Sequence, residues 1–211
     1  MPATRHTFVS AQRLPGWLDR LAAGNGELDI TPEHGGLHVR AANGTEADLR
    51  APWPDDGRPG RGTSDVERLA SLAGQSRTLG IVLLRRGGYA AGVAREGLLL
   101  ASKAGNRYVQ SRTAAGGGSQ QRFARRRANQ ADALVETAAE QAARLFAGHP
   151  PEYLVFGGDR TLTELLARQK VFTRWNSLPR LQPLDVQDPK RAVLAQAAKD
   201  ACSVSIRITV P

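Results

Sequence analysis

The sequence predicts a mixed α/β fold, in which a β-meander is followed by alternating helices and strands and preceded by a small mixed extension. Three observations lead to this prediction. Of the 211 residues, 41% are hydrophobic, which is enough to bury a sizeable core. Short apolar runs separated by glycine turns begin near residue 78. A long segment after residue 120 then carries apolar residues at helical spacing.

Residues 1–76 are predicted to form an N-terminal accessory segment. Its expected helix and strands are Leu14–Ala23, Leu28–Ile30, Gly36–Ala42 and Glu46–Arg50. The stretch 51–63 is rich in proline, glycine and other turn formers, so we expect a linker there. Ser64 is expected to cap a short helix, Asp65–Ala73, because Glu67 follows it at the spacing of a capping box.

Residues 77–211 are predicted to form the larger, catalytic domain, which begins with an antiparallel meander. Turns are expected at Gly87-Gly88, Glu96-Gly97 and Gly105-Asn106, because glycine tolerates the backbone angles of tight hairpins. The turns separate four strand-like segments: Leu79–Leu84, Tyr89–Ala94, Leu98–Ala101 and Arg107–Arg112.

The rest of this domain is predicted to alternate between helices and strands. A long amphipathic helix is expected to run to about Ala147, because Gly148 and Pro150 then end the apolar pattern. The following strands and helices are expected at Tyr153–Phe156, Thr161–Arg168, Leu181–Val186, Lys190–Ala201 and Ser203–Val210. This order matches the ribonuclease-H-like architecture, a mixed sheet flanked by helices.

The net charge of +9 is concentrated in one fifth of the chain. Residues 85–127 hold ten basic side chains and one acid, Glu96, whereas the remaining residues hold 19 of each sign. Dense arginine with few counter-charges is typical of a surface that binds a phosphate backbone. A membrane surface or a solvated basic face is the alternative. No amphipathic helix with large apolar anchors accompanies the cluster, and Arg122–Arg127 contains no acid, so nucleic acid is favoured.

Several other classes of protein are disfavoured. No apolar run is long enough for a membrane span and the first residues do not look like a signal peptide, so we expect a cytoplasmic protein. The single cysteine, Cys202, cannot form an internal disulfide and is expected to pack in the core. The glycine-rich stretch lacks the Gly-Lys-Ser/Thr ending of a nucleotide-binding loop.

Metal catalysis is also disfavoured. A two-metal nuclease needs converging carboxylates, yet Leu79–Leu84 contains no acid. Asp159 stands alone after a predicted strand, and we expect it at a helix N-terminus or in a turn. The four histidines lack a cysteine or carboxylate partner at ligand spacing: His6, His34, His38 and His149. No metal and no other cofactor is therefore expected.

A glycine-rich loop at 114–121 is the strongest candidate for a catalytic site. A backbone without side chains can enter a narrow cavity lined by RNA, and the amide of Gln120 can orient a water molecule. The alternative is a flexible loop in which Ser119 caps the following helix. The arginines expected to hold RNA phosphates on either side are Arg107, Arg112, Arg122, Arg125, Arg126 and Arg127.

Residues 78–210 resemble the Vms-like release factor family, whose domain is related to the middle domain of eukaryotic and archaeal peptide-release factors. The resemblance rests on Arg107-Tyr108-Val109, on Gly117-Gly118-Ser119-Gln120 and on the basic helix that follows. It implies a ribonuclease-H-like fold and hydrolysis of peptidyl-tRNA on stalled large ribosomal subunits. Position by position, Gln120 matches the family glutamine, and Gly117, Gly118 and Ser119 match the residues before it.

The chain departs from termination factors in two ways. Those factors have Gly-Gly-Gln, whereas here Ser119 intervenes and a second glutamine, Gln121, follows. We expect the role to fall to Gln120 rather than to Gln121. We also expect neither a codon-reading domain nor the partner-binding modules of eukaryotic members. It therefore resembles a compact actinobacterial branch that acts without decoding a codon.

The expected function is that of a peptidyl-tRNA hydrolase in ribosome rescue and ribosome-associated quality control, acting on stalled ribosomes or split large subunits. The expected partners are the large ribosomal subunit, peptidyl-tRNA and rRNA, with no membrane, and the protein is expected to act as a monomer. Two alternatives stay open: metal-independent cleavage of the tRNA 3′ CCA end, and a ribosome- or RNA-binding module without catalytic activity.

Overall fold

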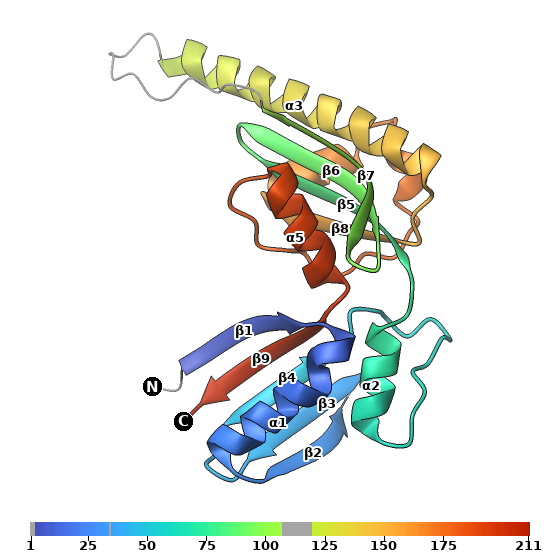
Figure 1. Cartoon of the computed structure of the whole chain (residues 1–211). Coiled ribbons are helices and arrows are strands. Elements are labelled where there is room, and N and C mark those ends of the chain that lie inside the picture. The colour runs from blue at the N-terminus through green and yellow to red at the C-terminus, as the bar shows by residue number, and fades with distance from the viewer. Residues whose placement is uncertain (1–2, 34, 107–119) are drawn as a thin grey trace. The chain divides into compact units, whose positions relative to one another are not determined.

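The computed structural model describes residues 3–33, 35–106 and 120–211, and of residues 120–129 it describes the backbone alone. The chain forms two compact units (Figure 1). The first consists of Met1–Ser76 together with Lys199–Pro211, and the second of Arg77–Ala198. Helices and strands are mixed in the chain, which confirms the predicted α/β class.

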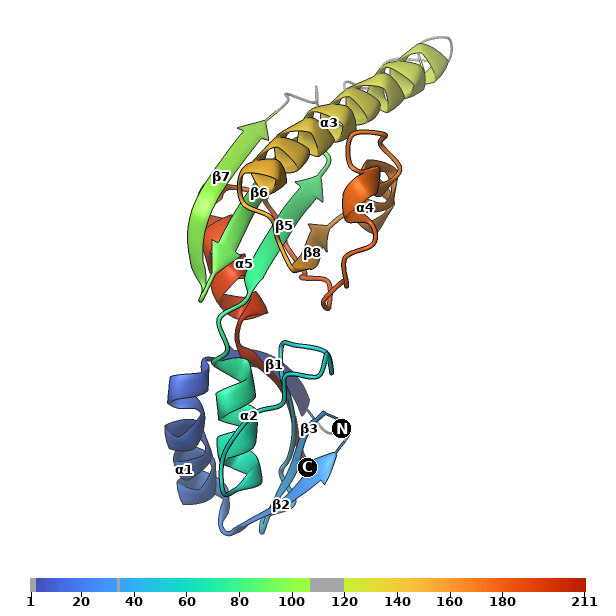
Figure 2. The same cartoon turned by 90° about the vertical axis from the view of Figure 1, so that its right-hand side faces the viewer.

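In the first unit, a five-stranded antiparallel sheet has the strand order β1-β9-β4-β3-β2. Its elements are β1 (Ala3–Val9), η1 (Ala11–Arg13), α1 (Leu14–Asn25), β2 (Leu28–Glu33), β3 (Gly36–Ala41), β4 (Glu46–Arg50), α2 (Asp65–Ala73) and β9 (Val204–Val210). Both helices lie on one face of this sheet (Figure 2), where Leu14, Val39 and Leu49 are fully buried in a shared core. Because strand side chains alternate between faces, His38 and Arg40 lie on the opposite, uncovered face.

The predicted helix, three strands and capped helix of residues 14–73 are present. Ser64 accepts a hydrogen bond from the backbone N–H of Glu67, and the Glu67 carboxylate accepts from the backbone of Ser64, which completes the capping box. The expected linker at 51–63 contains no helix or strand. Gln75 nevertheless ties it to the end of α2 by donating to the backbone oxygens of Arg58 and Pro59, at 3.0 and 3.1 Å.

The last strand differs from its predicted place. Ser203–Val210 was expected in the sheet of the larger domain, but β9 pairs with β1 and β4 in the first unit. The alternation of buried Val204 and Ile206 with more exposed residues identifies a strand, yet it does not specify the sheet that the strand joins. Its partner β1 was not predicted, because most of its residues are exposed and its apolar alternation is weak.

In the second unit, a four-stranded sheet has the order β7-β6-β5-β8. Its elements are β5 (Thr78–Arg85), β6 (Gly88–Arg95), β7 (Leu98–Asn106), α3 (Gln120–Gly148), β8 (Tyr153–Gly158), α4 (Arg160–Ala167), η2 (Thr173–Trp175) and α5 (Arg191–Ala201). The strands β5, β6 and β7 form the predicted antiparallel meander, and β8 pairs with β5 in parallel. The sheet is therefore mixed, as predicted, with an antiparallel meander and one parallel strand.

One predicted turn of this sheet is wrong. Gly105 and Asn106 do not form a turn, since they continue β7 opposite Tyr89 and Gly88. A Cβ atom on Gly105 would lie 2.6 Å from the Tyr89 ring, so the glycine serves close packing across the strands. The expected strand Arg107–Arg112 lies outside the described residues.

The segment expected as a strand at Leu181–Val186 forms a single isolated parallel bridge, Leu184 with Gly157, and a second bridge, Arg180 with Leu154, lies just before it. Pro183 lies between the bridging residues and has no N–H to donate to a ladder, which explains the interruption.

Helices α3 and α5 lie on opposite faces of the second sheet (Figure 1). On the α3 face, Val82 and Val93 of the sheet pack with Leu134 and Phe146 of the helix. Small residues permit the close approach, because a Cβ atom on Gly80 would lie 2.6 Å from the Phe146 ring. This packing sets the direction of α3, and with it the position of the helix start.

Candidate functional site

The predicted catalytic loop connects the end of β7, at Asn106, to the start of α3, at Gln120. Gly117, Gly118 and Ser119 lie outside the described residues, and so do Arg107 and Arg112. Gln120 is the first residue of α3, and the arginines at 122 and 125–127 lie in its first turns. The structure does not describe the side chains at these positions, so their roles stay predictions.

The position of the helix start follows from the packing of the rest of α3. Leu134, Ala138 and Phe146 are buried against the sheet, and Ala131 packs at the edge of this core. An α-helix rises about 1.5 Å per residue, so Gln120 lies roughly 16 Å beyond Ala131 along the helix axis. The loop is therefore attached to the first residue of α3, and the core holds the later turns of this helix in place.

Part of the basic cluster has a structural role that the charge count did not reveal. Arg95 donates two hydrogen bonds to Thr78 Oγ1, at 3.1 and 2.8 Å. Arg85 donates to the backbone oxygen of Val186 and lies 3.4 Å from the Asp185 carboxylate. Arg86 and Lys103 are exposed. Of the four described cations between residues 85 and 106, two therefore stay available to an external anion.

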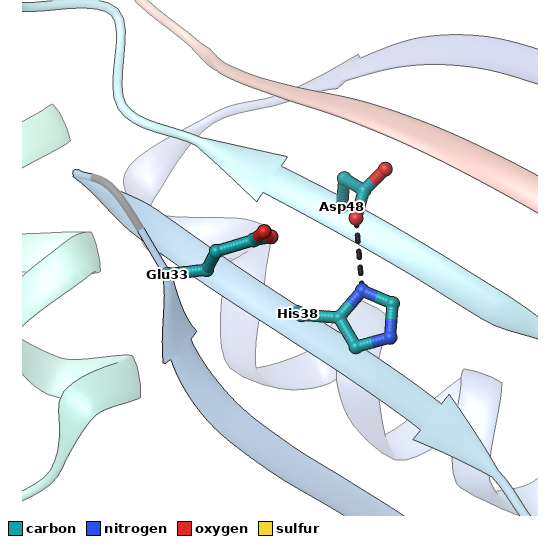
Figure 3. Close-up of side chains that lie close together, drawn as sticks. All are labelled: Glu33, His38 and Asp48. Carbon is teal, nitrogen blue, oxygen red and sulfur yellow. Dashed lines mark hydrogen bonds and ion pairs between the residues drawn. The ribbon is translucent and has the colours of Figure 1, made fainter.

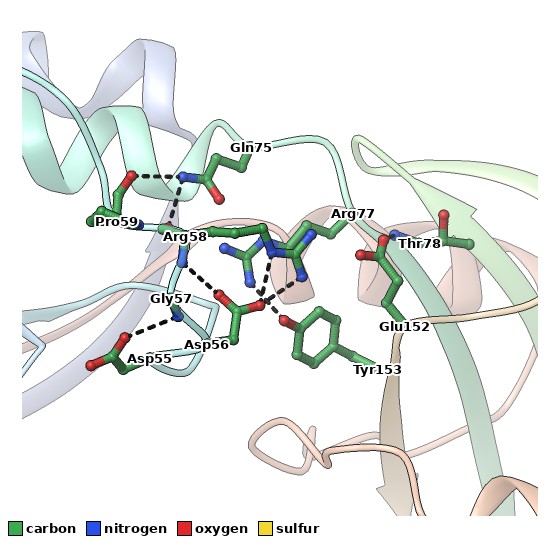
Figure 4. Close-up of polar contacts among 10 residues, drawn as sticks. All are labelled: Asp55, Asp56, Gly57, Arg58, Pro59, Gln75, Arg77, Thr78, Glu152 and Tyr153. Carbon is green, nitrogen blue, oxygen red and sulfur yellow. Dashed lines mark hydrogen bonds and ion pairs between the residues drawn. The ribbon is translucent and has the colours of Figure 1, made fainter.

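A second polar group surrounds the start of β5 (Figure 4). Arg77 is 1% exposed, donates to the Tyr153 hydroxyl at 2.7 Å, and places its guanidinium 5.6 Å from the Tyr153 ring centroid. The backbone N–H of Thr78 donates to the Glu152 carboxylate at 2.8 Å. Such a deeply buried arginine is out of reach of an RNA phosphate, so we assign this group a structural role.

The acidic residues of the second unit do not form a two-metal site in the described part of the chain. Strand β5 carries no acid. Asp159 is the N-cap of α4, where its carboxylate accepts from the backbone N–H of Leu162 at 3.2 Å. Of the two places expected for Asp159, a helix N-terminus or a turn, the structure shows the helix N-terminus.

Within the described residues, one group has the composition of a metal site, and it lies in the first unit (Figure 3). Glu33, His38 and Asp48 project from three neighbouring strands, and their potential ligand atoms lie within 4.8 Å of one another. His38 Nδ1 donates to Asp48 Oδ1 at 2.9 Å, and Arg207 donates to Asp48 Oδ2 at 2.7 and 3.1 Å. A cation would have to replace the His38 hydrogen bond and approach the Arg207 charge.

This group was missed because His38 had no partner at a usual ligand spacing in the sequence. The partners come from adjacent strands: His38 lies directly opposite Asp48, and Asp48 lies opposite Arg207. The alternating pattern of the two predicted strands around His38 and Asp48 was the available signal, because directly opposed residues share a face. These hydrogen bonds hold the pKa of Asp48 below its ordinary value, the bond from His38 contributing most and Arg207 next.

Comparison with protein families gives a match that covers the second unit. Residues 77–207 match the family described as the Actinobacteria/chloroflexi VLRF1 release factor. The matched residues include the sheet of the second unit, the loop and α3. No curated protein matches the chain. Among the described helices, none has the length and apolar character that a membrane crossing would require.

Proposed function

This chain belongs to the Actinobacteria/chloroflexi VLRF1 release factor family, and on that premise we propose that it hydrolyses peptidyl-tRNA on stalled ribosomes or split large subunits. The family match carries the proposal, because it spans the strand before the loop, the loop itself and the helix after it. The proposed setting is the cytoplasm, where the protein would act as a monomer in ribosome-associated quality control.

In the proposed reaction, water attacks the carbonyl carbon of the ester that joins the peptide to the terminal ribose. The bond to the ribose oxygen then breaks, and this oxygen leaves with a proton as the free hydroxyl of tRNA. The Gln120 amide does not titrate, so its proposed task is to orient the water. Positioning in a preorganised site can supply much of the acceleration without a strong base.

The helix start offers a second contribution to this chemistry. Gln120 opens α3, and the first backbone N–H groups of a helix have no partner within the helix. Together with the positive end of the helix dipole, they favour negative charge nearby. A carbonyl oxygen that gains negative charge during attack would be stabilised there.

We assign the docking of RNA to the arginines around the loop. Residues 122, 125 and 126 follow the three- and four-residue spacing that places positions on one face of a helix. The same register continues through the exposed Glu136 and Glu140. These positions are thus on the side of α3 away from its core, where phosphates can approach. Arg107, Arg112 and Arg127 are proposed to add contacts beside the loop.

The test is release of a labelled peptide from stalled large-subunit complexes. Gln120→Ala should slow release by about 100-fold, which is typical when one group that positions or stabilises the reacting atoms is removed. Gln121→Ala is the matched control and should release peptide at nearly the wild-type rate. Equal release by wild type and Gln120→Ala would rule out the role given to Gln120.

The same reactions separate hydrolysis from the two other expected functions. Ester hydrolysis leaves the CCA end of the released tRNA intact, whereas cleavage of the tRNA 3′ end shortens it. Gel mobility of the tRNA measures this difference. Binding without release or shortening by the wild-type protein would instead identify a binding module without catalytic activity.

A further inference from the structure

A second basic surface lies in the turns that follow α4. Residues 168–180, here called the 168–180 segment, contain four basic residues and no acid. The four side chains are exposed, and within the described part of the chain none of them pairs with a carboxylate: Arg168, Lys170, Arg174 and Arg180. By comparison, the exposed Arg160 on α4 pairs with Glu164 at 2.9 Å. The segment therefore presents an uncompensated positive charge.

Buried aromatic residues anchor this segment to the core. Phe172 is fully buried and Trp175 is 8% exposed, and both pack against Phe146 of α3, with ring centroids 5.9 and 5.6 Å away. Asn176 Nδ2 donates to the backbone oxygen of Ala167 at 2.7 Å, which ties the turns to the end of α4. The cations thus project from a backbone that the core and its hydrogen bonds keep in one shape.

Two of the arginines are also held at the guanidinium itself. The Arg174 Cζ atom lies 4.1 Å from the Trp175 ring centroid, and the Arg180 Cζ atom lies 5.1 Å from that of Phe156. Arg180 further donates to Asn176 Oδ1 at 3.3 Å. Stacking occupies the flat face of a guanidinium and leaves N–H groups at its edge for oxygen acceptors. Part of the entropy that an arginine loses on binding an anion is therefore already lost.

We propose that the 168–180 segment is a second docking surface, which binds backbone phosphates of large-subunit RNA. The inference rests on the proposed ribosomal function, since the large subunit offers a dense phosphate surface. The planar edge of arginine fits phosphate oxygens in a bidentate manner, and the absence of acids suits a polyanion. An acidic protein surface is the competing ligand, and the experiment below separates the two.

The second surface is distant from the loop. Phe172 and Trp175 pack beside Phe146, which lies 21 positions after Arg125 in α3. At about 1.5 Å per residue, the two basic regions are roughly 30 Å apart along the helix. Contacts at both ends of α3 would fix the orientation of the helix on RNA, and the second contact would raise the affinity of the first.

The experiment measures binding to purified large ribosomal subunits between about 50 and 200 mM salt. The triple variant Arg168→Ala, Lys170→Ala, Arg174→Ala should bind more weakly. The negative slope of its log affinity against log salt should become shallower by about two to three. The control variant Arg5→Ala, Arg13→Ala, Arg20→Ala removes the same charge from exposed positions of the first unit and should keep the wild-type slope. An unchanged triple variant, or an equal loss in the control, would overturn the proposal.

A conservative substitution tests the stacked arginine without changing charge. Arg174→Lys keeps the cation but loses the stacked, planar fork, so binding should weaken about three- to fivefold with little change in the salt slope. This variant also keeps the result interpretable if the triple variant does not fold. Affinity equal to that of wild type would overturn the role given to the stacked guanidinium.

Binding to protein-free large-subunit rRNA identifies the ligand. The triple variant should lose affinity for this RNA as well, whereas a loss seen only with intact subunits would mean an acidic protein ligand and would overturn the RNA assignment. Peptide release at saturating protein should stay at the wild-type rate, with a higher concentration needed for half-maximal release. If wild type releases no peptide but the RNA affinities differ as expected, the proposed function fails and the docking surface stands.

Discussion

The carboxylate of Asp48 accepts hydrogen bonds from His38 and Arg207, which approach from the neighbouring strands β3 and β9. Both partners favour the charged carboxylate, the His38 hydrogen bond most, and they hold the pKa of Asp48 below its ordinary value of 3.8. Because the pKa is lower in the folded than in the unfolded protein, this group stabilises the fold above about pH 4. The contribution is lost as the pH falls through the lowered pKa.

Asp48→Asn should therefore lower the unfolding temperature at neutral pH. The difference from wild type should shrink below about pH 4 and disappear at the lowest pH, because wild type then protonates the same group. Thermal unfolding followed over this pH range measures it. Asp19→Asn, at an exposed position of α1, controls for the loss of a charge alone. A difference between wild type and Asp48→Asn that stays constant with pH would contradict this account.

Single residues were predictable where their role is local. Ser64 caps the helix that follows it, as its spacing to Glu67 predicted, and Asp159 caps the helix that follows the strand before it. Arg85 and Arg95 were counted as free charge, but their partners Val186 and Thr78 are distant in sequence, so composition alone did not reveal these contacts. The same distance concealed the pairing of Asp48 with Arg207.

At the scale of elements, helix α4 begins directly after β8. Asp159, at this junction, could in principle serve either as a helix cap or as a metal ligand. Asp159 caps the helix through Leu162, and this contact accounts for the carboxylate without a metal. Asparagine caps helices as well as aspartate does but is a poorer ligand for hard cations. The two roles of this side chain can therefore be separated by substitution.

Asp159→Ala should lower the free energy of unfolding by about 1 kcal/mol, through loss of the cap. Asp159→Asn should keep the stability nearly unchanged and should also keep the wild-type rate of peptide release. Denaturant unfolding and the release assay provide the two measurements. Loss of release in a stable Asp159→Asn variant would instead indicate that the charge itself is needed.

Elements with a strong period were predicted from sequence within a few residues, as for α3, β5 and β6. The failures have local physical causes. Gly105 looked like a turn residue, but it is a glycine because the Tyr89 ring leaves no room for a side chain. Pro183 interrupts the pairing of a segment whose apolar pattern suggested a strand.

At the scale of the whole molecule, the two units share the chain in an order that sequence patterns did not specify. The second unit is continuous, whereas the first is assembled from residues on both sides of it. The pattern of β9 gave its existence and its buried face, but a pattern contains no information on the partner strand. The predicted catalytic residues at 117–119 lie outside the described part of the chain, so their assignment continues to rest on sequence resemblance.

The pairing of β9 predicts which strands lose stability when Ile206 is substituted. Ile206 is fully buried in the core of the first unit, so Ile206→Ala should destabilise that unit by about 2 to 5 kcal/mol. Hydrogen exchange should quicken in β3 and β4, more than 150 residues earlier in the sequence, while the amides of β5 and β6 keep their protection. The partly buried Ile208→Ala should have a smaller effect. Faster exchange in β5 and β6 instead would contradict this division.

The same strand sets an order for events during synthesis. Strand β9 lies between β1 and β4 and is the one partner of β1 in its sheet. Until residues 204–210 have left the ribosomal exit tunnel, β1 has no partner strand and β4 retains an unpaired edge, and open edges invite wrong pairing. The second unit is made earlier and has all its strands by then. The sheet of the second unit can thus form first, and the first unit would be the part at risk of misassembly until β9 joins its sheet.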